Sequence, residues 1–241
     1  MRSTINIRRG IVSGIVVTGL AATGIITGCS TDSSDDANSN TNTVATENTA
    51  NETRTTVSQG DLLSGTHHVQ LTVDGYDPIT IEVNADAAPI TATNFINLVN
   101  DGYYDGLAFY RIVDGFCLQG GTLGNTASGA DPSLDPIDGE FSDNGYDNSL
   151  ADDFTKGTVA MARTSDPNSA TSTFFVTLDD NSSVDASLNG QYAAFGMVDE
   201  AGMATIDKIV SDYISNVDDE AMGTISDENQ MPIISSITQV D

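Results

Sequence analysis

Basic side chains are scarce in this chain. It has 8 lysine and arginine residues against 35 aspartate and glutamate residues, which gives a formal net charge of −27 at pH 7. Three of the bases, Arg2, Arg8 and Arg9, lie near the N-terminus, so a mature chain without that segment carries a net charge of about −30. A surface this negative repels phosphate backbones, which excludes a nucleic-acid-binding protein.

Cysteine and histidine are also rare. Cys29 and Cys117 are the 2 cysteines, too few for a zinc cluster or a disulfide scaffold. The 2 histidines, His67 and His68, are neighbours that point to opposite faces of an extended run, which does not suit a cysteine–histidine protease. We therefore expect no metal and no cofactor.

Residues 1–28 have the pattern of an export signal. The three N-terminal arginines precede an apolar run, rich in glycine and alanine, over residues 11–26. This run is shorter than the ~20 residues that span a bilayer, although an uncleaved transmembrane anchor is the alternative. The run ends in Ile26-Thr27-Gly28-Cys29, which resembles the lipobox of bacterial lipoproteins. That resemblance implies cleavage before Cys29 and acylation of its sulfur.

A lipid-modified Cys29 would anchor the protein to the cell membrane on its extracytoplasmic side, because two acyl chains suffice for stable attachment. Residues 29–65 are rich in serine, threonine, asparagine and aspartate, and have too few branched apolar side chains to fold. We expect them to form a disordered tether with a reach on the order of 30 Å. The lipid would then be the only contact with the membrane.

The folded domain is expected over residues 66–241. Polar and apolar side chains alternate on both sides of Asp74-Gly75, a pattern typical of a β-hairpin. Further on, Phe95, Leu98 and Val99 have helical spacing. The predicted elements are strands over 68–73 and 79–83, a helix over 90–100, a strand beginning at 109, a helix over 202–211 and a closing strand over 232–240.

The segment 109–121, FYRIVDGFCLQGG, places an arginine and a glutamine in an otherwise apolar strand. Arg111 and Val113 share one face of that strand, so the guanidinium lies beside apolar side chains. An arginine in such surroundings needs a partner or a function. A carboxylate partner at the rim of a barrel is the structural alternative.

Two further segments follow along the chain. They are VAMARTSDPNSATSTFFVTL over 159–178 and LNGQYAAFG over 188–196. Together with TATNFINLVNDGYYDGLAFYR over 91–111, they resemble the cyclophilins, which are peptidyl-prolyl cis/trans isomerases. The resemblance covers roughly residues 66–241. It implies a mainly β fold: a closed eight-stranded antiparallel barrel capped by two helices.

The resemblance also implies a function and a site. The protein would isomerise X-Pro bonds of exported or surface polypeptides, acting as a monomer and assisting their folding. A protein that binds proline segments with little or no turnover is the alternative. Arg111 and Gln119 would be the catalytic residues, and the substrate-binding residues would be Phe116, Cys117, Ala162, Arg163, Thr173, Phe175, Leu188 and Tyr192. The phenylalanines can also be ordinary core residues.

Four positions depart from the family's usual pattern. Tyr110 and Tyr192 stand where histidine is common, Thr173 where a glutamine usually supports the arginine, and Ser187 where an aromatic side chain often closes the pocket. Isomerase activity is therefore expected at a rate set by how well the remaining residues hold the arginine, because such a site depends on fixed geometry.

The long loop over residues 122–155 is rich in acids, which leaves calcium binding as an alternative. Its aspartates lack the spacing of a calcium-binding loop with a terminal glutamate. The aspartates considered are Asp131, Asp135, Asp138, Asp143 and Asp147.

Overall fold

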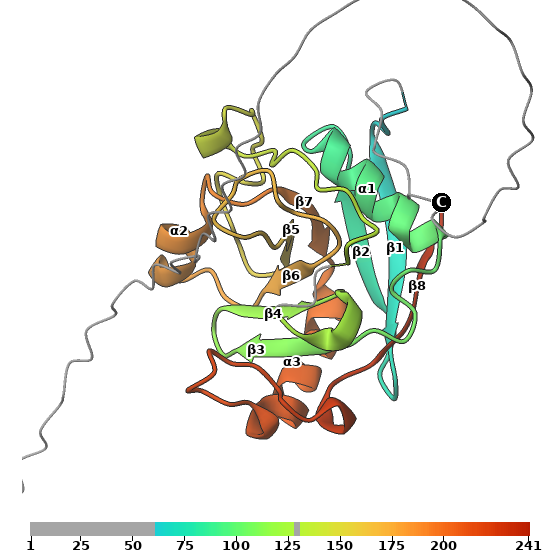
Figure 1. Ribbon diagram of the computed structural model, residues 1–241, viewed down its shortest axis with the longest axis vertical. Coiled ribbons are helices and arrows are strands. Elements are labelled where there is room, and N and C mark those ends of the chain that lie inside the picture. Colours follow the sequence, from blue (N-terminus) through green and yellow to red (C-terminus); the bar gives the residue numbers. More distant parts are fainter. Residues whose placement is uncertain (1–60, 128–130) are drawn as a thin grey trace, which may run out of the picture. The chain divides into compact units, whose positions relative to one another are not determined.

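The computed structural model describes residues 61–127 and 131–241, all within one unit of the chain, Thr49–Asp241 (Figure 1). The predicted signal segment 1–28, the predicted lipid site Cys29 and residues 29–60 of the predicted tether lie outside the described residues. Within the described ranges, no helix combines the length and the apolar character needed to cross a bilayer.

Eight strands form one antiparallel sheet in the order β3-β4-β6-β5-β7-β2-β1-β8. The strands are β1 (Thr66–Val73), β2 (Ile79–Asn84), β3 (Phe109–Val113), β4 (Cys117–Gly120), β5 (Thr158–Met161), β6 (Phe174–Thr177), β7 (Ala194–Val198) and β8 (Ile234–Gln239).

The sheet curls strongly, so that its two edge strands meet. Ala108, just before β3, forms an antiparallel bridge with Ile233, just before β8. The amide of Phe109 also donates a hydrogen bond to the carbonyl of Pro232 over 3.0 Å. The prediction of an eight-stranded antiparallel barrel is confirmed, with short bridges joining the edges in place of a full ladder.

The hairpin of β1 and β2 shows why the alternating pattern specifies this register. Val69 lies opposite Ile81, and Leu71 lies opposite Ile79, so buried side chains meet on one face of the pair. The turn contains Gly75 at a φ of +84°, a left-handed conformation that glycine adopts without steric cost. The predicted strands and turn are confirmed.

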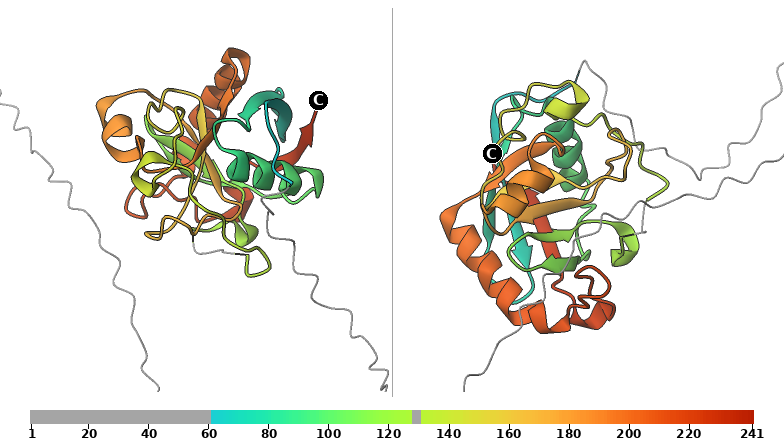
Figure 2. Two further views of the ribbon diagram at one scale, coloured as in Figure 1. Left: turned by 90° about the horizontal axis from the view of Figure 1, so that it is seen from above. Right: turned by 90° about the vertical axis from the view of Figure 1, so that its left-hand side faces the viewer.

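Two longer helices lie at opposite ends of the curled sheet (Figures 1 and 2). α1 (Pro89–Asn100) contacts β2, β7 and β8, and α3 (Glu200–Tyr213) packs on β2. Proline suits the first turn of α1, where its missing N–H is not needed. Asp199 caps α3 by accepting a 2.6 Å hydrogen bond from the amide of Gly202.

A third helix, α2 (Ser182–Leu188), was not predicted from the sequence. Its 7 residues are too few to show helical periodicity. The helix begins with a cap, because the side chain of Asn181 accepts hydrogen bonds from the amides of Ser183 and Val184. This helix carries Leu188, one of the predicted pocket residues.

The buried apolar side chains form two separate clusters. The larger one fills the interior of the curled sheet around Phe95, whose ring centroid lies 5.4 Å from that of Tyr104, 5.6 Å from that of Phe174 and 4.8 Å from that of Phe195. The smaller one is here named the groove cluster. Its 10 buried members are Cys117, Phe141, Ala151, Phe154, Ala160, Phe175, Val184, Leu188, Ala193 and Ala194, and its five partly buried members are Val113, Phe116, Leu150, Ala162 and Tyr192. Most of the predicted pocket residues belong to it.

Candidate active site

The register of three neighbouring strands brings the predicted catalytic residues into one row. Arg111 of β3 lies opposite Gln119 of β4, and Gln119 lies opposite Phe175 of β6. Directly opposed residues in an antiparallel sheet project from the same face. Arg111, Gln119 and Phe175 therefore lie side by side on the face that carries the groove cluster.

Arg111 is held by three hydrogen bonds. Its Nε donates to the carbonyl of Met222 over 2.9 Å, and its Nη1 donates to Oε1 of Gln119 over 3.0 Å and to Sγ of Cys117 over 3.1 Å. No partner of Nη2 is found among residues 61–127 and 131–241. The alternative in which a carboxylate pairs with this arginine is not what the structure shows.

Gln119 connects Arg111 to Tyr110. Because a guanidinium can only donate, it fixes the amide oxygen of Gln119 toward itself and turns the amide nitrogen to the other side. That nitrogen, Nε2, donates to the hydroxyl of Tyr110 over 2.6 Å. Tyr110, noted in the sequence only as a departure from histidine, thus helps to orient Gln119 and, through it, Arg111.

The carbonyl that holds Arg111 belongs to a turn docked on the edge of β3. The amide of Ile112 donates to the carbonyl of Gly223 over 2.8 Å, and the amide of Ile225 donates to the carbonyl of Tyr110 over 2.8 Å. Met222 and Gly223 both have left-handed backbones, with φ of 59° and 87°. Such a conformation is unfavourable for methionine, and here it aims the Met222 carbonyl at the guanidinium.

The groove cluster has a buried floor and a partly exposed rim. Cys117, Phe175 and Leu188 are buried, whereas Phe116 and Tyr192 are only partly buried. Ala162 also belongs to the partly buried group. A floor of this kind with an accessible edge can accept the apolar ring of a proline.

Aromatic contacts fix the floor. The ring of Phe175 meets that of Tyr192 edge-on at 5.6 Å between centroids, and it stacks on Phe154 at 6.2 Å. These pairs restrict Phe175 to one orientation. Phe154 was not identified from the sequence, because a phenylalanine in an acidic loop carries no signal of its position in the fold.

Arg163 stabilises one wall of the groove cluster. Its guanidinium lies over the rings of Phe141 and Tyr192, at 5.1 and 4.7 Å from their centroids. It also donates to the carbonyl of Gln191 from Nε and Nη2, over 3.0 and 2.7 Å. The side chain is thus used within the protein, and contact with a substrate would fall to the neighbouring backbone.

Thr173 and Ser187 are two of the positions that depart from the family's usual pattern. Thr173 supplies its carbonyl to the amide of Ala162 over 2.8 Å, and no hydrogen bond from it to Arg111 is found in the described part of the chain. Ser187 is exposed on α2. The arginine is thus supported by Gln119, Cys117 and a main-chain carbonyl, none of which depends on Thr173.

Glu140 and Asn148 position the acidic loop, and the sequence analysis missed both. The buried carboxylate of Glu140 accepts hydrogen bonds from the amides of Ile90 and Thr91, over 3.0 and 2.8 Å, at the first turn of α1. Asn148 donates to the carbonyl of Glu140 over 2.8 Å and to that of Ala194 over 2.9 Å. A Gly-Glu-Phe segment after proline-rich turns is too weak a signal to reveal this role.

The ionisable groups in contact with Arg111 and Gln119 titrate in the alkaline range. Burial raises the pKa of the Cys117 thiol to about 11, although the nearby Arg111 acts in the opposite direction. Burial also raises the pKa of Tyr110, with smaller opposing effects from Gln119 and Arg111. Both groups are therefore neutral at physiological pH. In the described ranges, no group of three or more metal-binding side chains lies close enough to hold a metal ion.

Comparison with known proteins agrees with this geometry. The family described as "Cyclophilin type peptidyl-prolyl cis-trans isomerase/CLD" matches residues 68–234. Peptidyl-prolyl cis-trans isomerase A of Dickeya dadantii is 36% identical over 171 residues, which is 69% of this chain and 80% of that protein. A peptidyl-prolyl cis-trans isomerase of Acinetobacter baylyi is 42% identical over 134 residues, 55% of this chain and 66% of that protein.

Solved structures show the same fold. A cyclophilin-type isomerase of Cryptosporidium parvum superposes with a TM-score of 0.59 at 23% identity, over 73% of this chain and 98% of that one. The same protein was also crystallised in the presence of the dipeptide Ala-Pro, and that structure superposes with a TM-score of 0.58 at 24% identity, over 72% of this chain and 99% of that one. The family match covers more than half of the chain, and Arg111, Gln119 and Phe175 lie in one row of the sheet, so the chain belongs to the cyclophilin-type peptidyl-prolyl cis-trans isomerases.

Proposed function

We propose that this isomerase acts on X-Pro bonds of exported or surface polypeptides, with Arg111 as the residue that lowers the barrier to rotation. The observation that carries the proposal is Nη2 of Arg111, which has no partner among residues 61–127 and 131–241 and lies on the face that carries the apolar groove cluster. The Ala-Pro dipeptide present with the Cryptosporidium relative supports proline-containing segments as substrates.

The chemistry requires no covalent step. Resonance opposes rotation about the amide with a barrier of about 18–20 kcal/mol, and the X-Pro bond turns over in tens of seconds without a catalyst. As the amide twists, the nitrogen lone pair becomes localised and can accept a hydrogen bond. A guanidinium that donates to this nitrogen stabilises the twisted state more than the planar one, which accelerates the reaction.

Each remaining part of the site holds geometry. Met222 and Gln119 fix the plane of the guanidinium, so that little freedom is lost when the substrate binds. Phe175 and Leu188 exclude water from one side of the prolyl ring, which strengthens the hydrogen bond to its nitrogen. Gln119 also lies where it can meet the backbone of the bound segment.

The location of the substrates follows from the N-terminal segment. The tetrad ending at Cys29 favours a lipid anchor on the extracytoplasmic side of the membrane, with the catalytic domain carried on a tether. Cys29→Ser tests this directly: the acylated form should disappear, and any cleaved protein should leave the membrane fraction. A cleaved Cys29→Ser protein that stays with the membrane would contradict the proposed anchor.

The enzymatic proposal is tested by isomerisation of a proline tetrapeptide by the purified full chain in detergent. The account predicts a rate enhancement that is proportional to enzyme concentration and saturates with peptide. Tight peptide binding without acceleration would instead establish the alternative, a protein that binds proline segments without turning them over.

A further inference from the structure

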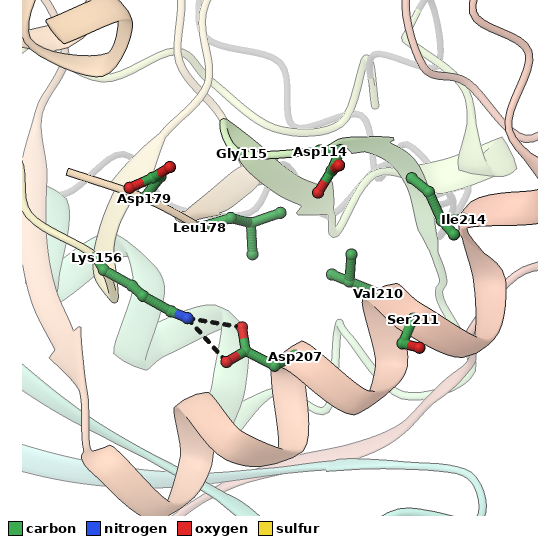
Figure 3. A pocket seen from close by; sticks show the side chains of 9 residues that line it. All are labelled: Asp114, Gly115, Lys156, Leu178, Asp179, Asp207, Val210, Ser211 and Ile214. Carbon is green, nitrogen blue, oxygen red and sulfur yellow. Dashed lines mark hydrogen bonds and ion pairs between the residues drawn. The ribbon is translucent and has the colours of Figure 1, made fainter. Parts of the chain in front are cut away.

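A second pocket, of about 370 Å³, opens beside the turn that joins β3 to β4 (Figure 3). Gly115 of that turn lines it, together with residues that follow β6 and residues of α3. None of the groove-cluster residues lines it. The cyclophilin mechanism described above makes no use of this pocket.

The floor of the pocket is apolar. Leu178 lies at its centre, and the lining also includes Val210 of α3 and Ile214, the residue that follows α3 (Figure 3). Ile214 is one of the few large apolar side chains that remain exposed, at 36% of its surface. Methylene groups placed over these three side chains would be removed from water, which favours binding.

The rim of the pocket is acidic. Three aspartates, Asp114, Asp179 and Asp207, surround it with a single lysine, Lys156. Lys156 is neutralised by Asp207, because its Nζ lies 2.8 and 2.9 Å from the two carboxylate oxygens. Among the described residues, Lys156 forms its ion pair with Asp207, and neither Asp114 nor Asp179 forms an ion pair with it. The pKa of Asp179 is nevertheless lowered, first by the hydrogen bond from Asn181 and to a smaller extent by Lys156.

Asp114 is the carboxylate best placed to bind a ligand. Figure 3 shows its side chain directed from the β3–β4 turn into the opening. No hydrogen bond or ion pair of this carboxylate is found within the described parts of the chain. Asp179, in contrast, already accepts a 3.0 Å hydrogen bond from the side chain of Asn181.

The occupant that fits is a long aliphatic side chain with a positive end. Each lysine and arginine of the described residues already has a partner: Arg111 binds Met222, Lys156 binds Asp207, Arg163 binds Gln191 and Lys208 binds Asp212. None of these four described bases is therefore free to bind Asp114, and a cation of another polypeptide suits the site.

We propose that this pocket binds a lysine or arginine side chain of the substrate polypeptide, with its methylenes on Leu178 and its charge at Asp114. The inference rests on the proposed function, since the groove must hold the same polypeptide. Gly115 lines the pocket and Phe116, the next residue, lies at the groove, so their Cα atoms are about 3.8 Å apart. An extended substrate advances about 3.5 Å per residue, so a few residues connect the two sites.

The test uses uncharged, end-capped peptides with one proline in an alanine background. A single lysine is placed two to six residues to either side of the proline, and norleucine replaces it in a matched set. Titration calorimetry with the full chain should show that, at one spacing, lysine tightens binding at least about 5-fold relative to alanine. Norleucine should tighten binding less, because it keeps the methylenes and lacks the charge.

Two variants separate the pocket from the general negative field of the protein. Asp114→Asn should remove most of the gain from lysine. Asp135→Asn removes an equal charge from an exposed loop outside the pocket, and it should leave the gain in affinity from lysine unchanged. Equal losses in both variants would overturn the proposal, as would the absence of a preferred spacing.

The neutral peptide distinguishes this inference from the proposed function. Wild type and Asp114→Asn should isomerise the alanine-background peptide at the same rate, because Asp114 takes no part in the catalytic site. A peptide that binds without being isomerised would refute the enzymatic proposal, whereas a flat lysine scan with normal isomerisation would refute only the second site.

Discussion

At the scale of single residues, the site depends on which N–H donors of Arg111 are used within the protein. Arg111 uses Nε and Nη1 to fix its own position, and within the described part of the chain Nη2 has no partner, which leaves it available for the proposed contact with the substrate. A lysine at this place could not do both, because its single ammonium group lacks the fixed planar geometry of a guanidinium. The site thus needs an arginine for its shape as much as for its charge.

The thiol of Cys117 should make the free energy of unfolding depend on pH. Its pKa is raised from 9.0 to about 11 in the folded protein, so above pH 9 the unfolded chain loses this proton while the folded chain keeps it. The free energy of unfolding should therefore fall by about 2–3 kcal/mol between pH 9 and pH 11 on account of this thiol.

Urea unfolding of wild type and Cys117→Ala at pH 8, 9, 10 and 11 checks this prediction. Buried tyrosines such as Tyr104 act in both proteins, so the difference between the two curves isolates the thiol. The variant should lose less stability than wild type over this range. Parallel curves would show that Cys117 ionises as readily in the folded state as in the unfolded one.

At the scale of elements, the turn that carries Met222 is the least predictable part of the site. The strand around Arg111 could be predicted because its motif is local, and so could the hairpin of β1 and β2. Met222 lies 111 positions from Arg111 and contributes only a carbonyl, which every residue type possesses. No pattern of side chains announces such a contact. The contact of Glu140 with α1 spans 50 positions, and it was also missed because its partners include two main-chain amides, which carry no sequence signal.

Gly223 tests the role of this turn. A Cβ there would lie 2.4 Å from the carbonyl oxygen of Ile112, and its φ of +87° disfavours any other residue. Gly223→Ala should displace the Met222 carbonyl and lower kcat roughly 10- to 100-fold, with KM little changed, because the guanidinium loses its fixed plane. Stopped-flow isomerisation assays separate the two constants.

Gly75→Ala is the matched control for backbone strain. Gly75 has a similar φ of +84° but no atom within 4 Å of a Cβ placed there, and it lies in the β1–β2 turn. This variant should lose some stability and keep its kcat. A loss of kcat as large as that of Gly223→Ala would mean that general destabilisation, and not the turn, accounts for the effect.

Glu140 connects α1 to the wall of the groove. Its carboxylate accepts hydrogen bonds from the amides of Ile90 and Thr91 and from the hydroxyl of Thr91, at the positive end of the helix dipole. Glu140→Ala should lower the free energy of unfolding by about 2–3 kcal/mol, because these donors are left without partners. Urea denaturation measures the loss. Asp138→Asn, an exposed neighbour, should change stability by less than about 0.5 kcal/mol, and an equal loss would contradict this role.

At the scale of the whole molecule, the two histidines lie on a different strand from Arg111 and Gln119. His67 and His68 both lie on β1, and the Nδ1 of His68 is hydrogen-bonded to Asp241 at the C-terminus. The ionisable contacts of Arg111 and Gln119 are Cys117 and Tyr110, whose pKa values are raised above their usual range. The catalysed rate should therefore be flat between about pH 6 and pH 8. A bell-shaped profile of kcat/KM centred near neutrality would contradict this.

A comparison of wild type with Arg111→Ala tests whether Arg111 stabilises the twisted amide. Isomerisation of a proline tetrapeptide and the affinity for the same peptide are measured for wild type and Arg111→Ala, with circular dichroism to confirm the fold. The account predicts that kcat falls at least ~100-fold while the peptide affinity changes only a few-fold, because the lost hydrogen bond forms mainly in the transition state. A folded Arg111→Ala variant that retains most of the wild-type kcat would contradict it.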